Sequence, residues 1–300
     1  MNLKKNLVFL GMMGSGKSSI GKLVSKKLNL KFVDIDPNTL NIDPKEIEAK
    51  ITDKTKVIMP VDFRGHPADL VAINKIAKKH GLFVVEDGSH SIGSTYKENG
   101  KSFSCGDGQH ADFCTFSFHP VKHITTGEGG AVLTNNHELF AKVSALSKHG
   151  IDRRDEMFSE SDRRGNWYYE MEMLGFNYRM TDIQAALGVS QMDRLDQFVA
   201  KRHELADRYN QLLKHLPLVL PWQNEDSYSA FHLYVVKYEP INGGKSFNEM
   251  FEFMREEGIG VNLHYMPVYK QPYYRRLGFS ENYCTEAERY YQSALSLPMY

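Results

Sequence analysis

LFVVEDGSHSIG, residues 82–93, opens with a short apolar run that ends in two carboxylates and a glycine. An apolar run of this length, with a glycine on each side, is typical of a buried strand. The carboxyl ends of strands in an open α/β sheet border the crevice in which ligands bind. Asp87, at the end of this run, is therefore a candidate ligand-binding residue. The alternative is that Asp87 caps a helix that follows the strand.

Strands and helices alternate on both sides of this run. Strands are expected over 6–11, 31–36, 56–61, 82–87, 111–118 and 129–134, and helices over 18–29, 44–51 and 66–81, the last ending at Gly81. This alternation predicts an α/β sandwich with a mostly parallel sheet. After a charged loop, a long helix from Thr181 leads into a smaller α+β domain, with strands over 231–238 and within 260–269 and a helix over 245–258.

Composition and charge argue against several classes of protein. Lys plus Arg and Asp plus Glu both number 37, so no excess charge predicts a nucleic-acid or membrane partner. The three cysteines lack CxxC spacing, which argues against a disulfide framework or a metal site and favours a reducing compartment. The apolar run near the start is shorter than a membrane span and lacks the cleavage site of a signal peptide. We therefore expect a cytoplasmic protein.

GMMGSGKS, residues 11–18, matches the phosphate-binding pattern G-x-x-x-x-G-K-S between an expected strand and an expected helix. Glycines let backbone N–H groups face a phosphate at the start of a helix, where the helix dipole also favours negative charge. A lysine and a serine at these positions serve the outer phosphates and Mg²⁺, so the motif predicts ATP and Mg²⁺ as ligands. The alternative is a glycine-rich turn without a ligand. The expected nucleotide-binding residues are Gly11, Gly14, Gly16, Lys17 and Ser18.

CTFSFHPVKHITTGEGGAVLT, residues 114–134, places Lys122 in a turn region between two expected strands. Most lysines are solvated surface charges, but Lys122 is surrounded by small, aromatic and hydrogen-bonding residues. A desolvated amine has a lowered pKa and can form a Schiff base with a carbonyl group. A lysine of this kind and an aspartate that pairs with a pyridinium nitrogen are the two anchors that pyridoxal 5'-phosphate (PLP) needs. Lys122 and Asp87 therefore predict PLP as the cofactor and transamination as the chemistry.

Over residues 31–300 the sequence resembles the sugar aminotransferases of the DegT family, which have the fold-type I PLP architecture. VEDGSH (85–90) is similar to the family's E-D-x-x-H, SFHPVKHITTGEGG (117–130) to its lysine motif, and GFNYRMTDIQAALG (175–188) to a further family segment. The resemblance implies that Lys122 is the catalytic lysine that carries PLP. It also implies cofactor contacts from Asp87 to the ring nitrogen, from His90 to the phenolic oxygen, from Ser117 to the phosphate, and from Asn177 to the phosphate in the neighbouring subunit of a homodimer.

Two further segments, GNWYYEMEMLGFNYRM (165–180) and HYMPVYKQPYYR (264–275), are similar to one branch of that family. This branch transfers the amino group of glutamate to the C4 ketone of a UDP-linked 4-keto-6-deoxy-N-acetylhexosamine, on the way to pseudaminic acid. The resemblance implies a nucleotide sugar and an amino-acid donor as the small-molecule partners. His264 and Tyr265 are the residues expected in the sugar pocket. The alternative is that they pack at the end of a strand in the small domain.

Residues 1–36 instead resemble the amino terminus of shikimate kinases, in which a P-loop unit precedes a strand that ends in D-x-D. That resemblance implies that Asp36 contacts shikimate and that Asp34 lies near the metal. The arginine clamps and lid that phosphoryl transfer requires do not follow in the sequence. Both resemblances include KFVDID (31–36). We therefore expect a P-loop βαβ unit to replace the first βαβ unit of the aminotransferase sheet, with 31–36 as the shared strand.

The predicted organisation is a P-loop segment over 1–36, a PLP-binding large domain over 37–190 and a small domain over 191–300. Relative to the family, we expect the amino-terminal region with its phosphate-binding turn, and a final helical segment, to be missing. Three functions stay open. The chain is a PLP-dependent aminotransferase whose activity the exchange has reduced, or an ATP-binding kinase-like fragment on an inactive aminotransferase platform, or a folded rearrangement product without activity. A yellow colour from PLP on Lys122 distinguishes the first from the others.

Overall fold

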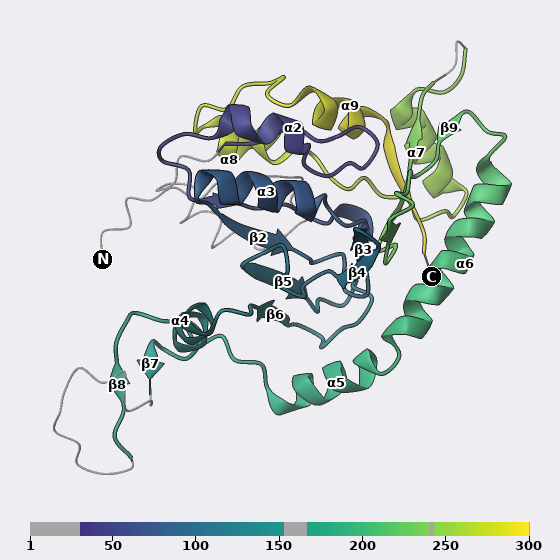
Figure 1. Ribbon diagram of the computed structural model, residues 1–300. Helices are drawn as coiled ribbons and strands as arrows, with labels where there is room; N and C mark the ends of the chain where they lie inside the picture. The colour runs from purple at the N-terminus through teal and green to yellow at the C-terminus, as the bar shows by residue number, and fades with distance from the viewer. Residues whose placement is uncertain (1–30, 153–166, 241–242, 300) are drawn as a thin grey trace.

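The structure is a computed structural model that describes residues 31–152, 167–240 and 243–299 (Figure 1). The strand and helix expected before residue 31 lie outside the described residues, and so do the P-loop residues Gly11, Gly14, Gly16, Lys17 and Ser18. ATP and Mg²⁺ at that loop therefore stay a prediction. Within the described ranges, no helix combines the length and the apolar character needed to cross a membrane.

Helices and strands alternate as predicted from α2 to β2, and then four strands, β3 to β6, follow without a helix between them. The helices are α2 (Pro44–Ile47), α3 (Leu70–His80), α4 (His137–Ser147), α5 (Asp182–Met192), α6 (Leu195–Leu213), α7 (Phe247–Glu256), α8 (Pro272–Arg275) and α9 (Thr285–Ser293). The strands are β1 (Val57–Ile58), β2 (Phe83–Asp87), β3 (Thr95–Glu98), β4 (Lys101–Ser104), β5 (Phe113–Ser117), β6 (Gly130–Leu133), β7 (Ile151–Asp152), β8 (Glu170–Met171), β9 (Leu218–Val219), β10 (Ser227–Tyr228), β11 (Tyr234–Tyr238) and β12 (Ala294–Leu297).

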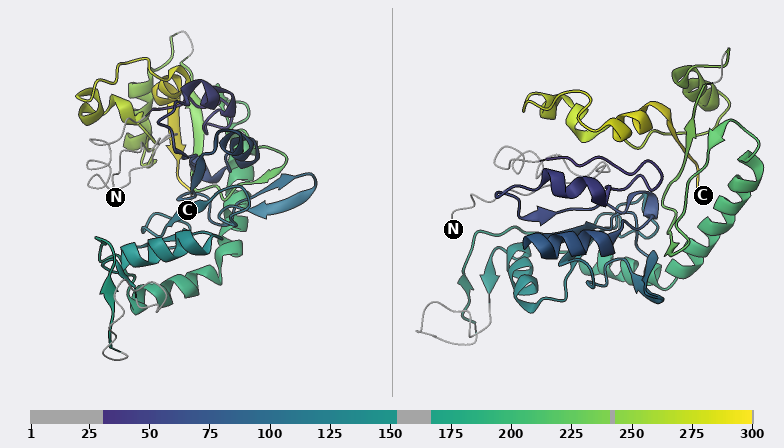
Figure 2. Two further views of the ribbon diagram at one scale, coloured as in Figure 1. Left: turned by 60° about the vertical axis from the view of Figure 1, so that its left-hand side comes forward. Right: turned by 45° about the horizontal axis from the view of Figure 1, so that its top comes forward.

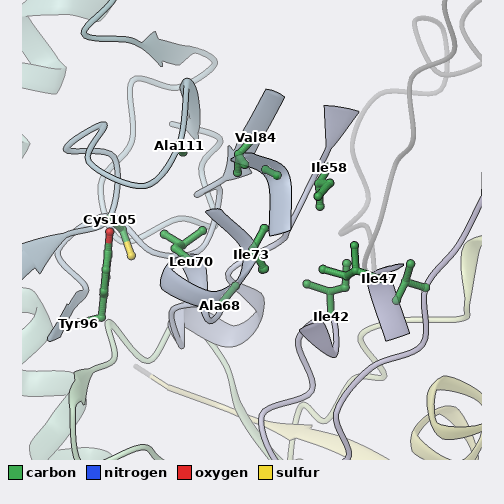
Figure 3. Close-up of a cluster of buried hydrophobic side chains, with 12 residues drawn as sticks. Ile42, Ile47, Ile58, Ala68, Leu70, Ile73, Val84, Tyr96, Cys105 and Ala111 are labelled. Carbon is green, nitrogen blue, oxygen red and sulfur yellow. The ribbon is translucent and has the colours of Figure 1, made fainter. Parts of the chain in front are cut away.

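The central sheet has the strand order β1-β2-β5-β6. β1, β2 and β5 are parallel, whereas β6 is antiparallel to β5, so the sheet predicted to be mostly parallel is mixed. α3 lies along β1 and β2 (Figure 1). Leu70 and Ile73 of α3 share a core with Ile58 and Val84 of the sheet, and each of the four is at most 1% exposed (Figure 3). Burying an aliphatic side chain contributes about 1.5–3 kcal/mol, so this contact fixes α3 on the sheet.

The ends of α3 explain why β2 lies beside β1. Asp69 caps the start of the helix, where its Oδ1 accepts from the backbone N–H of Ala72 at 2.9 Å. Gly81 ends the helix in the left-handed conformation, with φ 62°. β2 begins two residues later and pairs in parallel with β1, with Val57 opposite Phe83. The helix and strand predicted over 66–81 and 82–87 are confirmed.

The strand predicted over 31–36 is wrong. Ile35 makes one antiparallel bridge with Ile42, and neither residue belongs to the central sheet. The neighbouring apolar side chains face two different cores, because Val33 packs with the core under α3 and Phe32 packs with the aromatic side chains near the end of the chain. This part of the chain is therefore a connection between two cores. It supplies no shared strand for the predicted P-loop replacement of the first βαβ unit.

The two aspartates of this segment have structural roles, which corrects the kinase-like roles implied for them. Asp34 caps α9, because its carboxylate accepts from the backbone N–H groups of Glu286 at 2.9 Å and Ala287 at 3.0 Å. Oδ1 of Asp36 accepts from the backbone N–H of Thr39 at 2.8 Å in a tight turn. Carboxylates committed to backbone donors satisfy a helix start and a turn, which accounts for both residues without a metal or a kinase substrate.

The second half of the chain begins with two consecutive helices. Thr181 caps α5 in a capping box with Gln184, which confirms the helix start predicted there. α6 then runs along one side of the molecule toward the carboxy-terminal part (Figures 1 and 2). In that part, the antiparallel sheet β12-β11-β9 shares a core with α6 and α7. The predicted small α+β unit is present.

The strand predicted within 260–269 is also wrong. Asn262 makes a single bridge with Ser296 of β12, and no strand covers the rest of this range. The hydroxyl of Tyr290 donates to the carbonyl oxygen of His264, so a side chain satisfies this backbone group where a strand partner was expected. The hairpin of β3 and β4 and the last strand, β12, were not predicted.

One apolar core joins the two predicted domains. Ile92 and Ile124 pack in it with Leu195, Val199 and Ala230, which lie beyond the predicted boundary at 190. The contact fixes the start of α6 and the loop before β11 against the large domain. The domain ranges themselves stay a prediction.

Candidate active site

β2 and β5 end side by side. We call the side of the central sheet at which their carboxyl ends lie the sheet edge. In their parallel register Asp87 lies opposite Thr115, and Ser117 is the last residue of β5. Asp87 is half-buried, and its Oδ1 accepts from the backbone N–H of Ser89 at 3.1 Å. No helix follows it in the described chain, because residues 89–93 form turns that lead into β3, so the helix-cap alternative for Asp87 is wrong. Asp87 and Ser117 thus belong to the edge predicted to hold a ligand.

The loop between β5 and β6 carries Lys122. The loop is closed by a backbone hydrogen bond from Phe118 N to Gly129 O at 2.9 Å, and Lys122 N donates to His119 O at 2.9 Å. The Lys122 side chain is half-buried. Burial lowers the pKa of its amine to about 8, and the Asp87 carboxylate acts in the opposite sense. The charge of Asp87 thus acts on the Lys122 amine, and their roles toward PLP stay a prediction.

Three buried histidines, His90, His123 and His232, form what we call the imidazole cluster. The ring centroids of His90 and His232 are 4.3 Å apart, and those of His123 and His232 are 5.1 Å apart. Each of the three residues is at most 6% exposed. Among the described residues, nothing hydrogen-bonds to Nδ1 of His90 or to Nδ1 of His232. Buried polar atoms are normally satisfied, so the unpartnered ring nitrogen of His90 points to a bound group at this place.

The surroundings of the imidazole cluster keep it uncharged. Burial, then the charges of Lys122, His123 and His264, lower the pKa of His90. Burial is also the main cause that lowers the pKa of His232, and it lowers the pKa of His123 to about 3. The three imidazoles are therefore neutral at pH 7, and each offers one N–H donor and one nitrogen lone pair.

Comparisons with known proteins connect this site to one family. The profile of the DegT/DnrJ/EryC1/StrS aminotransferase family matches residues 19–300. The spore coat polysaccharide biosynthesis protein SpsC of Bacillus subtilis is 40% identical over 90% of this chain and 68% of its own length. The chain belongs to the DegT/DnrJ/EryC1/StrS aminotransferase family.

Two other matches agree with this membership. The UDP-4-amino-4,6-dideoxy-N-acetyl-beta-L-altrosamine transaminase of Campylobacter jejuni is 35% identical over 90% of this chain and 68% of its own length. The solved structure of Helicobacter pylori PseC, an aminotransferase involved in the biosynthesis of pseudoaminic acid, has a TM-score of 0.85 and 29% identity and covers 99% of this chain and 75% of that one. The predicted fold-type I architecture is confirmed. The family match begins at residue 19, so it includes residues 19–30, which the kinase resemblance also covered.

The chain is thus a member of a family of PLP-dependent aminotransferases, and the residues at the sheet edge fit that cofactor. Lys122 offers an amine with a lowered pKa, and Asp87 offers a carboxylate whose charge acts on that amine. His90 adds a buried ring nitrogen without a partner in the described chain, and Ser117 adds a hydroxyl at the end of β5. An amine, an acid and neutral hydrogen-bonding groups are what the carbonyl, ring nitrogen and oxygens of PLP require.

The two residues predicted for the sugar pocket differ in their surroundings. His264 is half-buried, and its Nδ1 lies 2.8 Å from Oγ of Ser296. Burial and then the charge of Lys122 lower the pKa of His264. Tyr265 packs against Phe63, with ring centroids 6.4 Å apart, at the border of the aromatic core. Neither residue ends a strand, so the strand-end alternative is wrong for both.

Asn177, predicted to reach the cofactor of a neighbouring subunit, lies between β8 and α5. Its side chain is exposed, and its backbone bridges Lys148 after α4. Large exposed apolar side chains lie around it in sequence and on β6, α4 and α5. We call these side chains the apolar region: Val132, Leu133, Phe140, Leu146, Trp167, Tyr169, Met171, Leu174, Phe176, Tyr178, Met180, Ile183, Leu187, Val189 and Met192.

A buried carboxyl pair, Asp62 and Glu86, lies behind the sheet edge. Oδ2 of Asp62 accepts from the Ser91 hydroxyl at 2.6 Å. The backbone N–H of Asp62 donates to the carbonyl oxygen of Asp87 at 3.1 Å. Burial, then the charge of Asp62, raise the pKa of Glu86 to about 9, and burial also raises the pKa of Asp62. The pair therefore holds a shared proton at neutral pH, which avoids two adjacent buried charges.

Sequence reasoning did not single out His232, and it named His123 only as a neighbour of Lys122. His232 is 110 positions from Lys122 in the sequence, so no local pattern connects the two residues. The available signal was weak. His232 stands between Phe231 and Leu233 inside the strand predicted over 231–238, where a polar residue interrupts the apolar run.

Proposed function

We propose that this chain is a nucleotide-sugar aminotransferase that carries PLP on Lys122. The observation that supports this most strongly is the half-buried amine of Lys122, whose pKa burial lowers to about 8, beside Asp87 and His90 at the ends of β2 and the following turn. In this proposal Asp87 pairs with the ring nitrogen, His90 bonds to the phenolic oxygen and Ser117 binds the phosphate. PLP, when bound, supplies an electron sink for negative charge at the substrate carbon that carries the amine.

Asp87 keeps a proton on the ring nitrogen, because a carboxylate beside that nitrogen favours its charged form. The imidazole cluster contributes no competing positive charge, since burial keeps its three rings neutral. His90 can therefore donate to or accept from an oxygen without a change in the net charge of the site.

Lys122 moves the proton through its Nζ. A general acid–base group transfers a proton in both directions most effectively when its pKa is near the working pH. A lysine with the ordinary pKa of 10.5 is almost fully protonated at pH 7, whereas the half-buried Lys122, with a pKa of about 8, retains a useful neutral fraction. The burial that excludes water from this amine thus also makes it a competent base.

For the amino-group exchange we propose glutamate as the donor and the C4 ketone of a UDP-linked 4-keto-6-deoxy-N-acetylhexosamine as the acceptor. The support is the 35% identity to the Campylobacter jejuni transaminase and the likeness to PseC. The charge of Lys122 acts on His264, which is the side chain that we assign to the sugar. Tyr265, beside it on the border of the core, is assigned to the same pocket with a packing contact to Phe63.

We also propose a homodimer in which Asn177 reaches the cofactor phosphate of the partner. The apolar region supports this, because α5 has no buried residue in the single chain and Ile183 is 84% exposed. Exposed apolar areas of this extent are typical of protein interfaces. Subunit mixing tests the shared site. Lys122→Ala and Asn177→Ala chains, each weak alone, should recover activity when unfolded and refolded together, whereas a site built within one chain recovers none.

The cofactor proposal is tested by near-visible absorption of the purified protein titrated with PLP, before and after borohydride. We expect a new band that borohydride abolishes while it fixes the cofactor to Lys122, as located by peptide mass spectrometry. The Lys122→Ala variant should show no such band. Lys78→Ala, at an exposed position on α3, is the matched control. Absence of the band in the wild-type protein contradicts the proposal.

The substrate proposal is tested separately. Protein that forms the band is mixed with glutamate, aspartate or alanine, and loss of the band identifies the donor. The donor-loaded protein is then offered nucleotide-sugar ketones that differ in the nucleotide, in the keto position or in the N-acetyl group. Return of the band with a UDP-linked 4-keto-6-deoxy-N-acetylhexosamine, and with no other compound at a similar rate, is the expected result. Equal return with sugars that lack the N-acetyl group contradicts the finer assignment.

A further inference from the structure

The loop that carries His232, residues 229–232, is held from several sides. Nη1 of Arg202 on α6 donates to the carbonyl oxygens of Phe231 at 3.0 Å and His232 at 3.3 Å. On the other flank the backbone N–H of Ala230 donates to the hydroxyl of Ser94 at 2.9 Å. These bonds join α6 and the turn before β3 to one short loop. The position of His232 is therefore determined by tertiary contacts.

Gly65 brings this loop close to the backbone of His90. A Cβ at Gly65 would lie 2.9 Å from the carbonyl oxygen of His90, 2.9 Å from the backbone nitrogen of Phe231 and 3.0 Å from that of His232. Such distances are too short for a real Cβ contact. Gly65 also has φ 90°, a conformation that other residues rarely adopt. The absence of a side chain at Gly65 is what allows the two histidine-bearing segments to approach.

The rings of the imidazole cluster pack directly against one another. The His90 and His232 rings are tilted by 42° at 4.3 Å between centroids, which is too close for an in-plane hydrogen bond between them and suits a stacked contact. His123 meets His232 edge-on at 5.1 Å, and Phe63 contacts His90 at 5.9 Å. Nδ1 of His90 has no hydrogen-bond partner among the described residues, and the rings of Phe63 and His232 pack against this imidazole.

We propose that His232 is a positioning residue, which holds the imidazole of His90 by ring packing in the orientation that the phenolic oxygen of PLP requires. This inference rests on the proposed function of His90. It assigns to His232 a role that acts through His90 and requires no contact between His232 and the cofactor. We assign this contribution to the ring, because the ring contacts two neighbours while Nδ1 of His232 bonds to nothing in the described chain.

Two substitutions separate a ring contribution from a nitrogen contribution. His232→Ala removes the ring, and His232→Phe keeps an aromatic ring in its place but removes both nitrogens. Replacing an unsatisfied buried polar group by an apolar group of similar shape is close to neutral for stability. We therefore expect His232→Phe to fold as well as the wild type. Chemical denaturation of both variants without PLP shows whether either has lost its fold.

The first test is a double-mutant cycle on cofactor affinity. We expect His232→Ala to raise the dissociation constant of PLP about tenfold, while His232→Phe retains nearly the wild-type value. In a His90→Ala background the same His232→Ala change should have an effect below about twofold, because residues that act through one another are not additive. An equal loss in both backgrounds, or a loss with His232→Phe as large as with His232→Ala, overturns the proposal.

The second test needs no cofactor, so its outcome stands even where PLP binding itself fails. Diethyl pyrocarbonate modifies accessible imidazoles, and mass spectrometry locates the modified histidine in the protein without PLP. His90 should be protected in the wild type and in His232→Phe and become reactive in His232→Ala. Continued protection of His90 in His232→Ala overturns the inference. Failure of the wild-type protein to bind PLP, with His90 exposed only in His232→Ala, instead removes the proposed function and leaves the packing role.

Discussion

The sheet edge around Lys122 and the apolar region around α5 are built from opposite kinds of side chain. At the sheet edge, neutral imidazoles lie buried beside a half-buried lysine, and Nδ1 of His90 bonds to nothing in the described chain. In the apolar region, Leu174 is 87% exposed and Ile183 is 84% exposed. Folding alone favours the reverse arrangement, with polar groups satisfied and large apolar groups covered.

The difference between the two regions indicates what each one binds. Buried polar atoms without partners lower stability, and a small polar molecule restores the missing bonds. Exposed apolar side chains are covered by another apolar surface, and in these proposals that surface belongs to a second copy of the chain. Asn177 links the two regions. It lies among the residues of the apolar region in its own chain, and we assign it to the sheet edge of the partner.

Loss of the Lys122 amine is the largest effect that we expect. Lys122→Ala should lower the transamination rate by about 10³-fold or more, because it removes both the attachment of PLP and the group that moves the proton. Single-turnover assays with excess PLP and donor measure this loss. Lys78→Ala should keep the wild-type rate. A Lys122→Ala rate within tenfold of the wild type would show that transamination at the sheet edge does not depend on this amine.

A charge placed in the apolar region should have the second-largest effect. Ile183→Glu puts a carboxylate on the exposed face of α5, where the proposed partner would have to desolvate it. We expect the dimer dissociation constant to rise at least about tenfold, as measured by sedimentation velocity across a concentration series. Glu46→Gln, at an exposed position of α2, is the control for a surface change elsewhere. An unchanged sedimentation profile would leave α5 outside any interface.

Removing the buried charge at the sheet edge should stabilise the protein without PLP. The folded-state pKa of Lys122, about 8, is below its ordinary value of 10.5, so the folded state binds this proton less tightly than the unfolded state. Stability from this group therefore rises between about pH 8 and 10.5, and below pH 8 the full penalty applies. Lys122→Met should raise the unfolding free energy at pH 7 by about 1–3 kcal/mol, and the gain should shrink above pH 8.

Urea denaturation of the two proteins without PLP, at pH 7, 8.5 and 10, measures this difference. A gain that is constant across the three pH values contradicts the proposed cause, because it would come from packing and not from the amine. The comparison with Ile183→Glu is informative here. Both changes should reduce function, but only the change at the buried lysine should increase the stability of the single chain.

The smallest effect concerns the buried carboxyl pair behind the sheet edge. Glu86 has a folded-state pKa of about 9, above its ordinary value of 4.5, so the folded protein keeps a proton that the unfolded chain loses. Wild-type stability from this group is greatest at low pH and falls between about pH 4.5 and 9. Glu86→Gln cannot titrate and keeps an amide that can donate to Asp62. Between pH 6 and 8 it should therefore gain about 1–2 kcal/mol over the wild type. Urea denaturation of both proteins between pH 6 and 8 measures this gain. If the unfolding free energies of the wild type and Glu86→Gln depend on pH in the same way, the shared proton is contradicted.

Much of the fold could be predicted because its signals are local. The helix ending at Gly81, the strand ending at Asp87 and the helix starting at Thr181 follow from an apolar period plus a cap or stop residue. The misassigned segments, 31–36 and 260–269, have strand-like composition but bond to distant partners. In the first, Asp34 caps a helix more than 250 residues away, and no pattern within a short window contains that information.

The sequence by itself determined which side chains we propose to carry the chemistry. Asp87, His90, Ser117 and Lys122 stand in motifs whose residue types already specify an amine, an acid and hydrogen-bonding groups, and a strand end places them near the ligand edge. Tertiary structure decided the environment that makes these groups useful. The lowered pKa of Lys122 requires burial by the assembled loop, and the orientation of His90 requires His232, which folding brings from far along the chain past Gly65. Burial and ring packing depend on neighbours in space, and only the folded chain supplies them.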